Sequence, residues 1–102
     1  MKIKVPKQVK IGAHTYSVWL NPNLMSDDRT HGQINHRIER IIIQKDDPDM
    51  LKTETLIHEI IHLGEFCYRI PIEDADIDRI AEVILQFLDQ LGIKFSWDDI
   101  SC

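Results

Sequence analysis

The segment at residues 53–68 constrains the fold most strongly, because it contains the pattern His-Glu-x-x-His at 58–62 within an apolar sequence. On an α-helix, residues four apart lie on one face, so His58 and His62 can direct their imidazoles at one metal ion. Glu59 is offset by about 100° around the helix. Its carboxylate therefore lies beside the metal, where it can take a proton from metal-bound water.

The residues around the motif favour a helix. Chance placement in a chain with 5 histidines yields roughly 0.01 such patterns. Apolar residues also follow the spacing of a buried stripe, which leaves the two histidines on a neighbouring face. This stripe consists of Ile57, Ile60, Ile61 and Gly64. The alternative is a structural helix whose two histidines only pack against the edge of the core.

Length and composition indicate one soluble globular domain, residues 1–102. The chain is 43% hydrophobic and 28% charged. No stretch approaches the roughly 18 apolar residues of a membrane span, and the N-terminus has no apolar signal region. We therefore expect a cytoplasmic protein without a membrane partner. Cys67 and Cys102 are expected to be free thiols.

Charge is distributed unevenly. The net charge of −5 divides into +5 for residues 1–45 and −10 for residues 46–102. The lysines of the basic half are scattered over expected strands rather than gathered on one face, which argues against a nucleic-acid partner. Acidic residues near a dication site are compatible with metal attraction, although a solvated helix face accounts for most of them.

The first half of the chain predicts a short antiparallel sheet of three or four strands. Residues 8–11 and 15–20 alternate with period two around a turn at residues 12–14. After a polar connection, residues 33–35 and 40–44 form a second strand pair. The run Ile41-Ile42-Ile43 is typical of a strand covered on both faces.

The second half predicts two helices, which makes the fold class α+β. The motif helix is expected at residues 48–68, with Asp47 as N-cap and Pro48 at the first helical position. A second helix is expected at residues 73–91. Its core stripe is Ile77, Ile80, Ala81, Ile84, Leu85, Leu88 and Leu91.

A tetrahedral zinc with two histidines and a water needs one further protein ligand. The start of the second helix offers acidic residues, and Asp74 and Glu73 lie on its inward face. Asp76 and Asp78 are expected to point away. Asp74 is preferred because it is three residues before Ile77, and Glu73 is the fallback. The competing interpretation is that these residues only complement the helix dipole.

The order of these motifs resembles the small HExxH proteins common in bacteriophage and prophage genomes, close in pattern to minimal gluzincins and to the ImmA/IrrE-like metallopeptidases. The resemblance covers nearly the whole chain. After basic N-terminal strands come GQIN at 32–35, RIIIQ at 40–44, TLIHEIIH at 55–62 and DADIDRIAEVIL at 74–85.

The resemblance implies a zinc metallopeptidase, a hydrolase with Zn²⁺ as cofactor and a peptide or protein as substrate. In those families the third zinc ligand is a glutamate seven residues before a small residue that matches Ala81. This chain has the shorter Asp74 at that position. Either the helix lies closer, Glu73 reaches in instead, or zinc binding is weakened. Neither the substrate nor the oligomeric state is indicated.

The leading hypothesis is an endopeptidase in which Glu59 is the general base and the strand at residues 41–44 pairs with an extended substrate as an edge. Tyr68, His31 and His36 are unranked candidates for stabilising the oxyanion. The alternative is a non-catalytic, metal-stabilised phage regulatory or binding module. A purely partner-binding helix surface is disfavoured, because no exposed apolar run is evident.

The C-terminal residues 95–102 allow two interpretations. They could fold back over the cleft and keep an enzyme latent, with Cys102 or an acidic residue displacing the catalytic water. The simpler expectation is that Phe95 and Trp97 only cover the end of the second helix.

Overall fold

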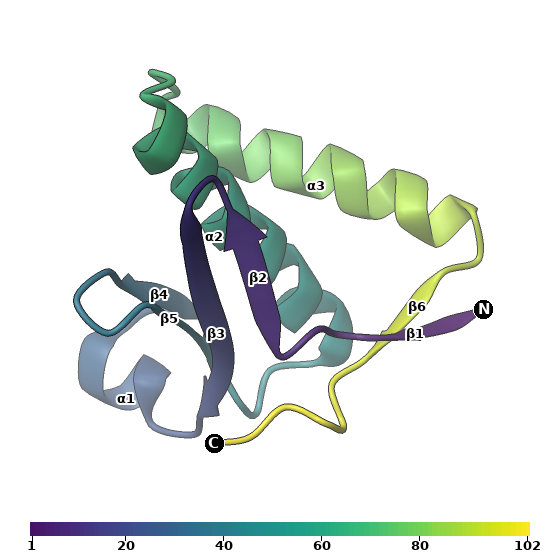
Figure 1. Ribbon diagram of the computed structural model, residues 1–102. Coiled ribbons are helices and arrows are strands. Elements are labelled where there is room, and N and C mark those ends of the chain that lie inside the picture. Colours follow the sequence, from purple (N-terminus) through teal and green to yellow (C-terminus); the bar gives the residue numbers. More distant parts are fainter.

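The fold is α+β, as the sequence predicts. The computed structural model describes residues 1–102 (Figure 1). In chain order the elements are β1 (Lys2–Lys4), β2 (Gln8–Ile11), β3 (His14–Asn21), α1 (Leu24–Asp28), β4 (Gly32–Asn35), β5 (Arg40–Gln44), α2 (Asp49–Tyr68), α3 (Asp74–Gln90) and β6 (Lys94–Ser96). The short helix α1 lies within the segment predicted as a polar connection. No helix combines the length and the apolar character that crossing a membrane requires.

The main sheet has the strand order β2-β3-β5-β4 and is mixed rather than wholly antiparallel. Both predicted strand pairs are present as antiparallel neighbours, β2 with β3 and β4 with β5. Their inner strands, β3 and β5, run parallel. The chain reaches this arrangement because α1 and β4 carry it back across the molecule before β5 begins. β5 is therefore a central strand and β4 an edge strand.

Helix α2 lies against the sheet and α3 packs on α2 (Figure 1). The core between sheet and α2 is built from alternate residues of the central strands and from one side of the helix. Its buried members include Tyr16, Val18, Leu20, Ile41, Ile43, Leu56 and Leu63. The predicted stripe of α2 is only partly buried: Ile57, Ile60 and Ile61 are half-buried, and Ile60 packs against the core. The helix has neighbours on two sides, so its apolar residues divide between two contacts.

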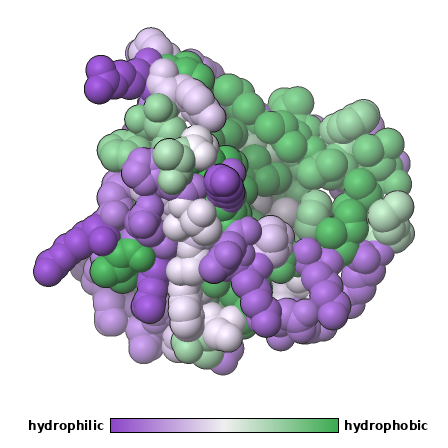
Figure 2. Space-filling model, viewed as in Figure 1, coloured by the Kyte–Doolittle hydropathy of each residue, from purple (hydrophilic) through white to green (hydrophobic).

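Helix α3 buries only part of its predicted stripe. Ile77, Ala81 and Leu85 are buried, whereas Ile80, Ile84 and Leu91 are exposed. The exposed Val83 and Phe87 extend this apolar face. Figure 2 shows apolar residues gathered over the side of the molecule that α3 occupies. The expectation that the helices have no exposed apolar surface was therefore wrong, since periodicity marks an apolar face but not how much of it is covered.

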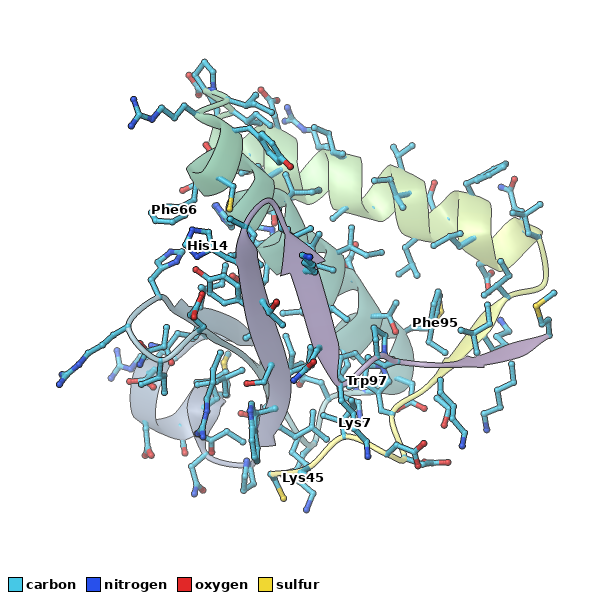
Figure 3. The ribbon with its side chains drawn as sticks, viewed as in Figure 1. Lys7, His14, Lys45, Phe66, Phe95 and Trp97 are labelled. Atoms are coloured by element: carbon cyan, nitrogen blue, oxygen red, sulfur yellow. The ribbon has the colours of Figure 1, made fainter.

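The C-terminal segment packs beside the first turns of α2, not over the histidines. Strand β6 pairs with β1 in parallel. The buried Trp97 donates its indole N–H to Oγ1 of Thr53 at 3.1 Å. The Cys102 thiol lies 3.6 Å from Nζ of Lys45. In Figure 3, Trp97 and Lys45 lie below and away from Phe66. The hypothesis that the tail folds over the cleft was therefore wrong, and the tail instead completes the core.

Candidate metal centre

The two motif histidines converge on one face of α2. Their Nε2 atoms lie 3.0 Å apart, and their ring centroids are separated by 4.6 Å. One turn of helix separates the two residues, which is why their side chains meet as the spacing predicts. Both rings are less than one-third exposed, so they lie at the surface of a partly enclosed site.

The opposite ring nitrogen of each histidine faces a carboxylate. Nδ1 of His58 lies 2.7 Å from Oδ1 of Asp78. Nδ1 of His62 lies 3.0 Å from Oε1 of Glu65. An ionised carboxylate only accepts hydrogen bonds, so each Nδ1 carries the proton and donates it. In the neutral rings, both Nε2 lone pairs are then left facing one another, an arrangement used by metal-binding histidines.

A zinc ion fits this arrangement. Zn–N bonds of about 2.0–2.1 Å in a tetrahedral site place two ligand nitrogens about 3.3 Å apart, close to the separation of the histidines. Two lone pairs at 3.0 Å repel each other unless a cation or a proton lies between them. The donor set of imidazoles with carboxylates behind them is one that zinc prefers.

The contact of Asp78 with His58 corrects the prediction that this aspartate points away. Asp78 follows the buried Ile77 directly, so its side chain leaves α3 at the border of the contact with α2. Its spacing to the buried Ala81 and Leu85 is i, i+3, i+7, which marks one helix face. This spacing was the signal in the sequence that could have identified Asp78.

The third ligand stays a prediction. Oδ1 of Asp74 lies 4.0 Å from Nε2 of His62, and the Asp74 side chain is 89% exposed. Glu73 is the N-cap residue of α3 and makes no contact with either histidine. No group of three or more His, Cys, Asp or Glu side chains has the geometry of a metal site. Asp74 is thus the nearer of the two predicted carboxylates, and its exposed side chain is free to rotate toward the pair.

Glu59 is largely buried, has no hydrogen-bond or ion-pair partner in the protein, and reaches solvent through the cavities beside the histidines. It is 8% exposed. It lies against β4, because a Cβ atom at Gly32 would be only 3.2 Å from its Oε1. Burial raises the pKa of the Glu59 carboxyl above its ordinary value, while His58 and His62 lower it by a smaller amount. A desolvated carboxylate beside two histidines has the properties of a general base.

Two cavities flank the histidines, and Glu59 lines both. The first, here called the Phe66 cavity, has a volume of about 590 Å³. Its lining includes Ile34, His36, Glu59, His62, Phe66 and Arg69. The second, called the Glu54 cavity, has a volume of about 320 Å³. Its lining includes His31, Glu54, His58, Glu59, Asp78 and Glu82.

The structure separates the three oxyanion candidates. His36 lines the Phe66 cavity together with His62 and Glu59. Its ring stacks on Phe66 at 4.2 Å between centroids, and its Nδ1 lies 2.8 Å from the hydroxyl of Tyr16. Burial raises the pKa of the Tyr16 hydroxyl, and the neutral hydroxyl can donate to Nδ1 of His36. With that hydroxyl as donor, the ring proton of His36 is on Nε2.

The other two candidates are placed differently. Tyr68 is exposed and lines neither cavity. His31 lines the Glu54 cavity, and its Nδ1 lies 2.7 Å from Asp47. This contact explains why the predicted cap was wrong. The Asp47 carboxylate bonds to His31 instead of capping α2, and Pro48 is the N-cap residue.

The edge strand beside the site is β4, not the predicted strand at residues 41–44. β5 is paired on both sides, as a run of three isoleucines would suggest for a central strand. β4 is paired only with β5, so its other edge is open. Gly32 in β4 lies against Glu59, and Ile34 lines the same cavity as His62, so this strand borders the site.

Comparison with known proteins identified no relative. No family model matches the chain, and no curated protein or solved structure is significantly similar to it. The geometry of the site therefore carries the functional proposal.

Proposed function

We propose that the chain is a zinc-dependent metallopeptidase of the HExxH class that its motif resembles. The observation that carries the proposal is the pair of Nε2 atoms of His58 and His62, 3.0 Å apart, with a carboxylate behind each ring. Beside this pair lies a buried, unpartnered glutamate, Glu59. A purely structural metal site has no use for such a carboxylate.

His58 and His62 would hold the metal, with Asp74 as the third protein ligand. When bound, zinc supplies a Lewis acid that polarises a carbonyl and lowers the pKa of a water molecule to about 7. Glu59 takes the proton of the attacking water and returns it to the leaving amine. Its burial favours this role, because desolvation raises its pKa toward the working pH.

An extended substrate would pair with the open edge of β4. Main-chain hydrogen bonds to an edge strand position a peptide without regard to its sequence. Gly32 allows β4 to lie close to α2, because its missing side chain leaves room for Thr55 and Glu59 of that helix. A peptide on this edge would present its backbone to the histidines and to Glu59.

His36 is the candidate that would stabilise the oxyanion. Its stacking on Phe66 and its hydrogen bond with Tyr16 hold the ring in place within the Phe66 cavity. Nε2–H is the donor that this pairing leaves free for a substrate carbonyl oxygen. Removing one such donor costs about 10²–10³ in kcat in well-studied hydrolases.

A second candidate function is a non-catalytic, metal-stabilised binding module. The exposed apolar face of α3 favours it, because such surfaces often mark protein contacts. The buried charge of Glu59 argues against it. A carboxylate beside the two histidines, without a hydrogen-bond or ion-pair partner in the protein, suits proton transfer, which a binding module does not need.

The test is metal analysis combined with a peptidase assay. We expect one zinc per chain in the wild type and none after His62→Ala. Glu59→Ala should keep the fold and the zinc but eliminate turnover, because the glutamate transfers protons and does not bind the metal. Zinc at one per chain without either histidine would locate the site elsewhere. Unchanged turnover in Glu59→Ala would exclude this residue as the base.

A further inference from the structure

The Glu54 cavity is surrounded by acid. Carboxylates of Glu54, Glu59, Asp78 and Glu82 line it, and no lysine or arginine does. Asp78 is engaged with His58, and Glu82 accepts a hydrogen bond from Gln86. Glu54 is half-buried and has neither an ion-pair partner nor a hydrogen bond from its side chain. The cavity thus has four carboxylates and no lysine or arginine, and a zinc ion on the histidines would offset only part of this negative charge.

A second observation indicates that this cavity receives a ligand. Glu59 is more than nine-tenths buried, has no hydrogen-bond partner and forms part of the same wall. Its carboxylate oxygens have no partner in the protein and stay accessible from the cavities, so a group that enters the Glu54 cavity can reach them. A positively charged group in the cavity would offset the mutual repulsion of the carboxylates. Lysine and arginine also have apolar stems long enough to reach such a cavity from a peptide backbone.

The Phe66 cavity on the other side of Glu59 has a different character. Apolar side chains of Ile34, Phe66, Ile70 and Pro71 line it. Its charged residues are Glu59, Glu65 and Arg69, so the arginine offsets part of the acid, whereas no lysine or arginine does so in the Glu54 cavity. The two sides of the site therefore differ in the residue that they accommodate.

Strand β4 gives these two cavities a direction. His31, just before β4, lines the Glu54 cavity, whereas Ile34 in β4 and His36 after it line the Phe66 cavity. The strand thus runs from the acidic cavity to the apolar one. Antiparallel pairing is slightly more stable per residue than parallel pairing. A peptide that pairs antiparallel with β4 runs opposite to that strand, so its chain passes from the Phe66 cavity to the Glu54 cavity.

We propose that the substrates are peptides with a large apolar residue before the scissile bond and a lysine or arginine directly after it. This inference rests on the proposed peptidase function. The scissile bond lies opposite Glu59, which borders both cavities. The apolar side chain enters the Phe66 cavity, and the basic side chain enters the Glu54 cavity.

The test uses fluorescein-labelled octapeptides that are identical except for the dipeptide at the centre: Phe-Lys, Phe-Glu or the reversed Lys-Phe. Affinity is measured by fluorescence anisotropy with metal-free wild-type protein, which keeps all four carboxylates of the Glu54 cavity and separates binding from turnover. Cleavage is measured with the wild type. We expect Phe-Lys to bind and react about tenfold better than Phe-Glu, since several weak ion pairs contribute. Phe-Lys should also exceed Lys-Phe.

Charge reversal at the cavity provides the matched control. Glu82→Lys should remove the preference for Phe-Lys over Phe-Glu, whereas Asp98→Lys makes the same change in net charge outside the cavity, in the C-terminal segment. Asp98 is exposed and lines neither cavity, so it should keep the preference.

The outcomes distinguish the two proposals. Turnover without a preference for Phe-Lys overturns the inference and leaves the peptidase. A Phe-Lys preference in binding without turnover by the wild type overturns the peptidase and retains a site for basic peptides. Neither binding nor turnover overturns both.

Discussion

Gly32 is the point where β4 approaches α2 most closely, and its replacement by alanine tests this geometry. A Cβ atom at this position would lie 2.4 Å from Cγ2 of Thr55 and 3.2 Å from Oε1 of Glu59. Thr55 cannot easily rotate away, because it is buried and its hydroxyl donates to the carbonyl of Leu51 at 2.8 Å. Since φ of Gly32 is not positive, backbone strain contributes nothing and the effect is steric.

Two opposing terms decide the sign. Alanine restricts the unfolded chain, which stabilises a protein by about 0.4–1 kcal/mol where the folded backbone permits it. Overpacking a core contact costs about 1–3 kcal/mol. For Gly32→Ala we expect the steric term to dominate, lowering the free energy of unfolding by about 1–2 kcal/mol and Tm by roughly 4–16 °C. Urea denaturation, followed by circular dichroism, measures the change in the free energy of unfolding, and thermal denaturation measures the change in Tm.

Gly64→Ala is the matched control with the opposite sign. Gly64 lies within α2, and nothing is within 4 Å of a Cβ atom added there. Alanine should therefore stabilise the protein by about 0.5–1 kcal/mol. Adding Thr55→Ser to Gly32→Ala removes the clashing methyl group and should recover most of the loss. If Gly32→Ala is as stable as the wild type, β4 does not lie this close to α2.

Three further predictions concern the residues around the histidines. Asp78→Asn should weaken zinc binding about 10-fold or more, measured by chelator competition. Asp76→Asn on the same helix should leave the affinity unchanged. Equal affinities of the two variants would show that Asp78 does not support the metal ligand His58. Asp74→Ala should lower zinc affinity about 10-fold or more in the same assay; wild-type affinity would exclude it as the third ligand. Tyr16→Phe should lower kcat without changing KM or zinc affinity, because it frees the ring of His36; an unchanged kcat would contradict this positioning role.

Local patterns were sufficient to predict most of the elements. The strands β2 and β3 could be predicted because side chains alternate on either side of a glycine that the turn needs in the left-handed region, with φ of 61° at Gly12. The helices could be predicted from apolar spacing and from the proline and glycine residues near their ends. The i, i+4 spacing likewise predicted that the histidines meet, since both residues belong to one helix.

The pairing of distant segments could not be predicted in this way. β1 and β6 are three-residue strands separated by about the whole chain, and neither has an apolar alternation that marks it as a strand. The parallel contact of β3 with β5 likewise depends on where α1 and β4 lead the chain. As a result, β5 was predicted to be the edge strand beside the site, whereas the edge strand is β4. The isoleucine run of β5 was itself characteristic of a central strand.

The surroundings of the histidines depend on how α3 crosses α2, which no local pattern describes. α3 is anchored by the buried Ile77, Ala81 and Leu85, and the same helix supplies Asp78 to His58 and Asp74 to the neighbourhood of His62. The packing of α3 on α2 leaves most of α3 exposed. A metal held by residues of both helices would add a link between them. Ligand binding to the folded state alone stabilises by about 2.7 kcal/mol at 100 times Kd. In a chain of this size, that amount is comparable to burying one large apolar side chain, so the metal centre would serve the fold as well as the chemistry.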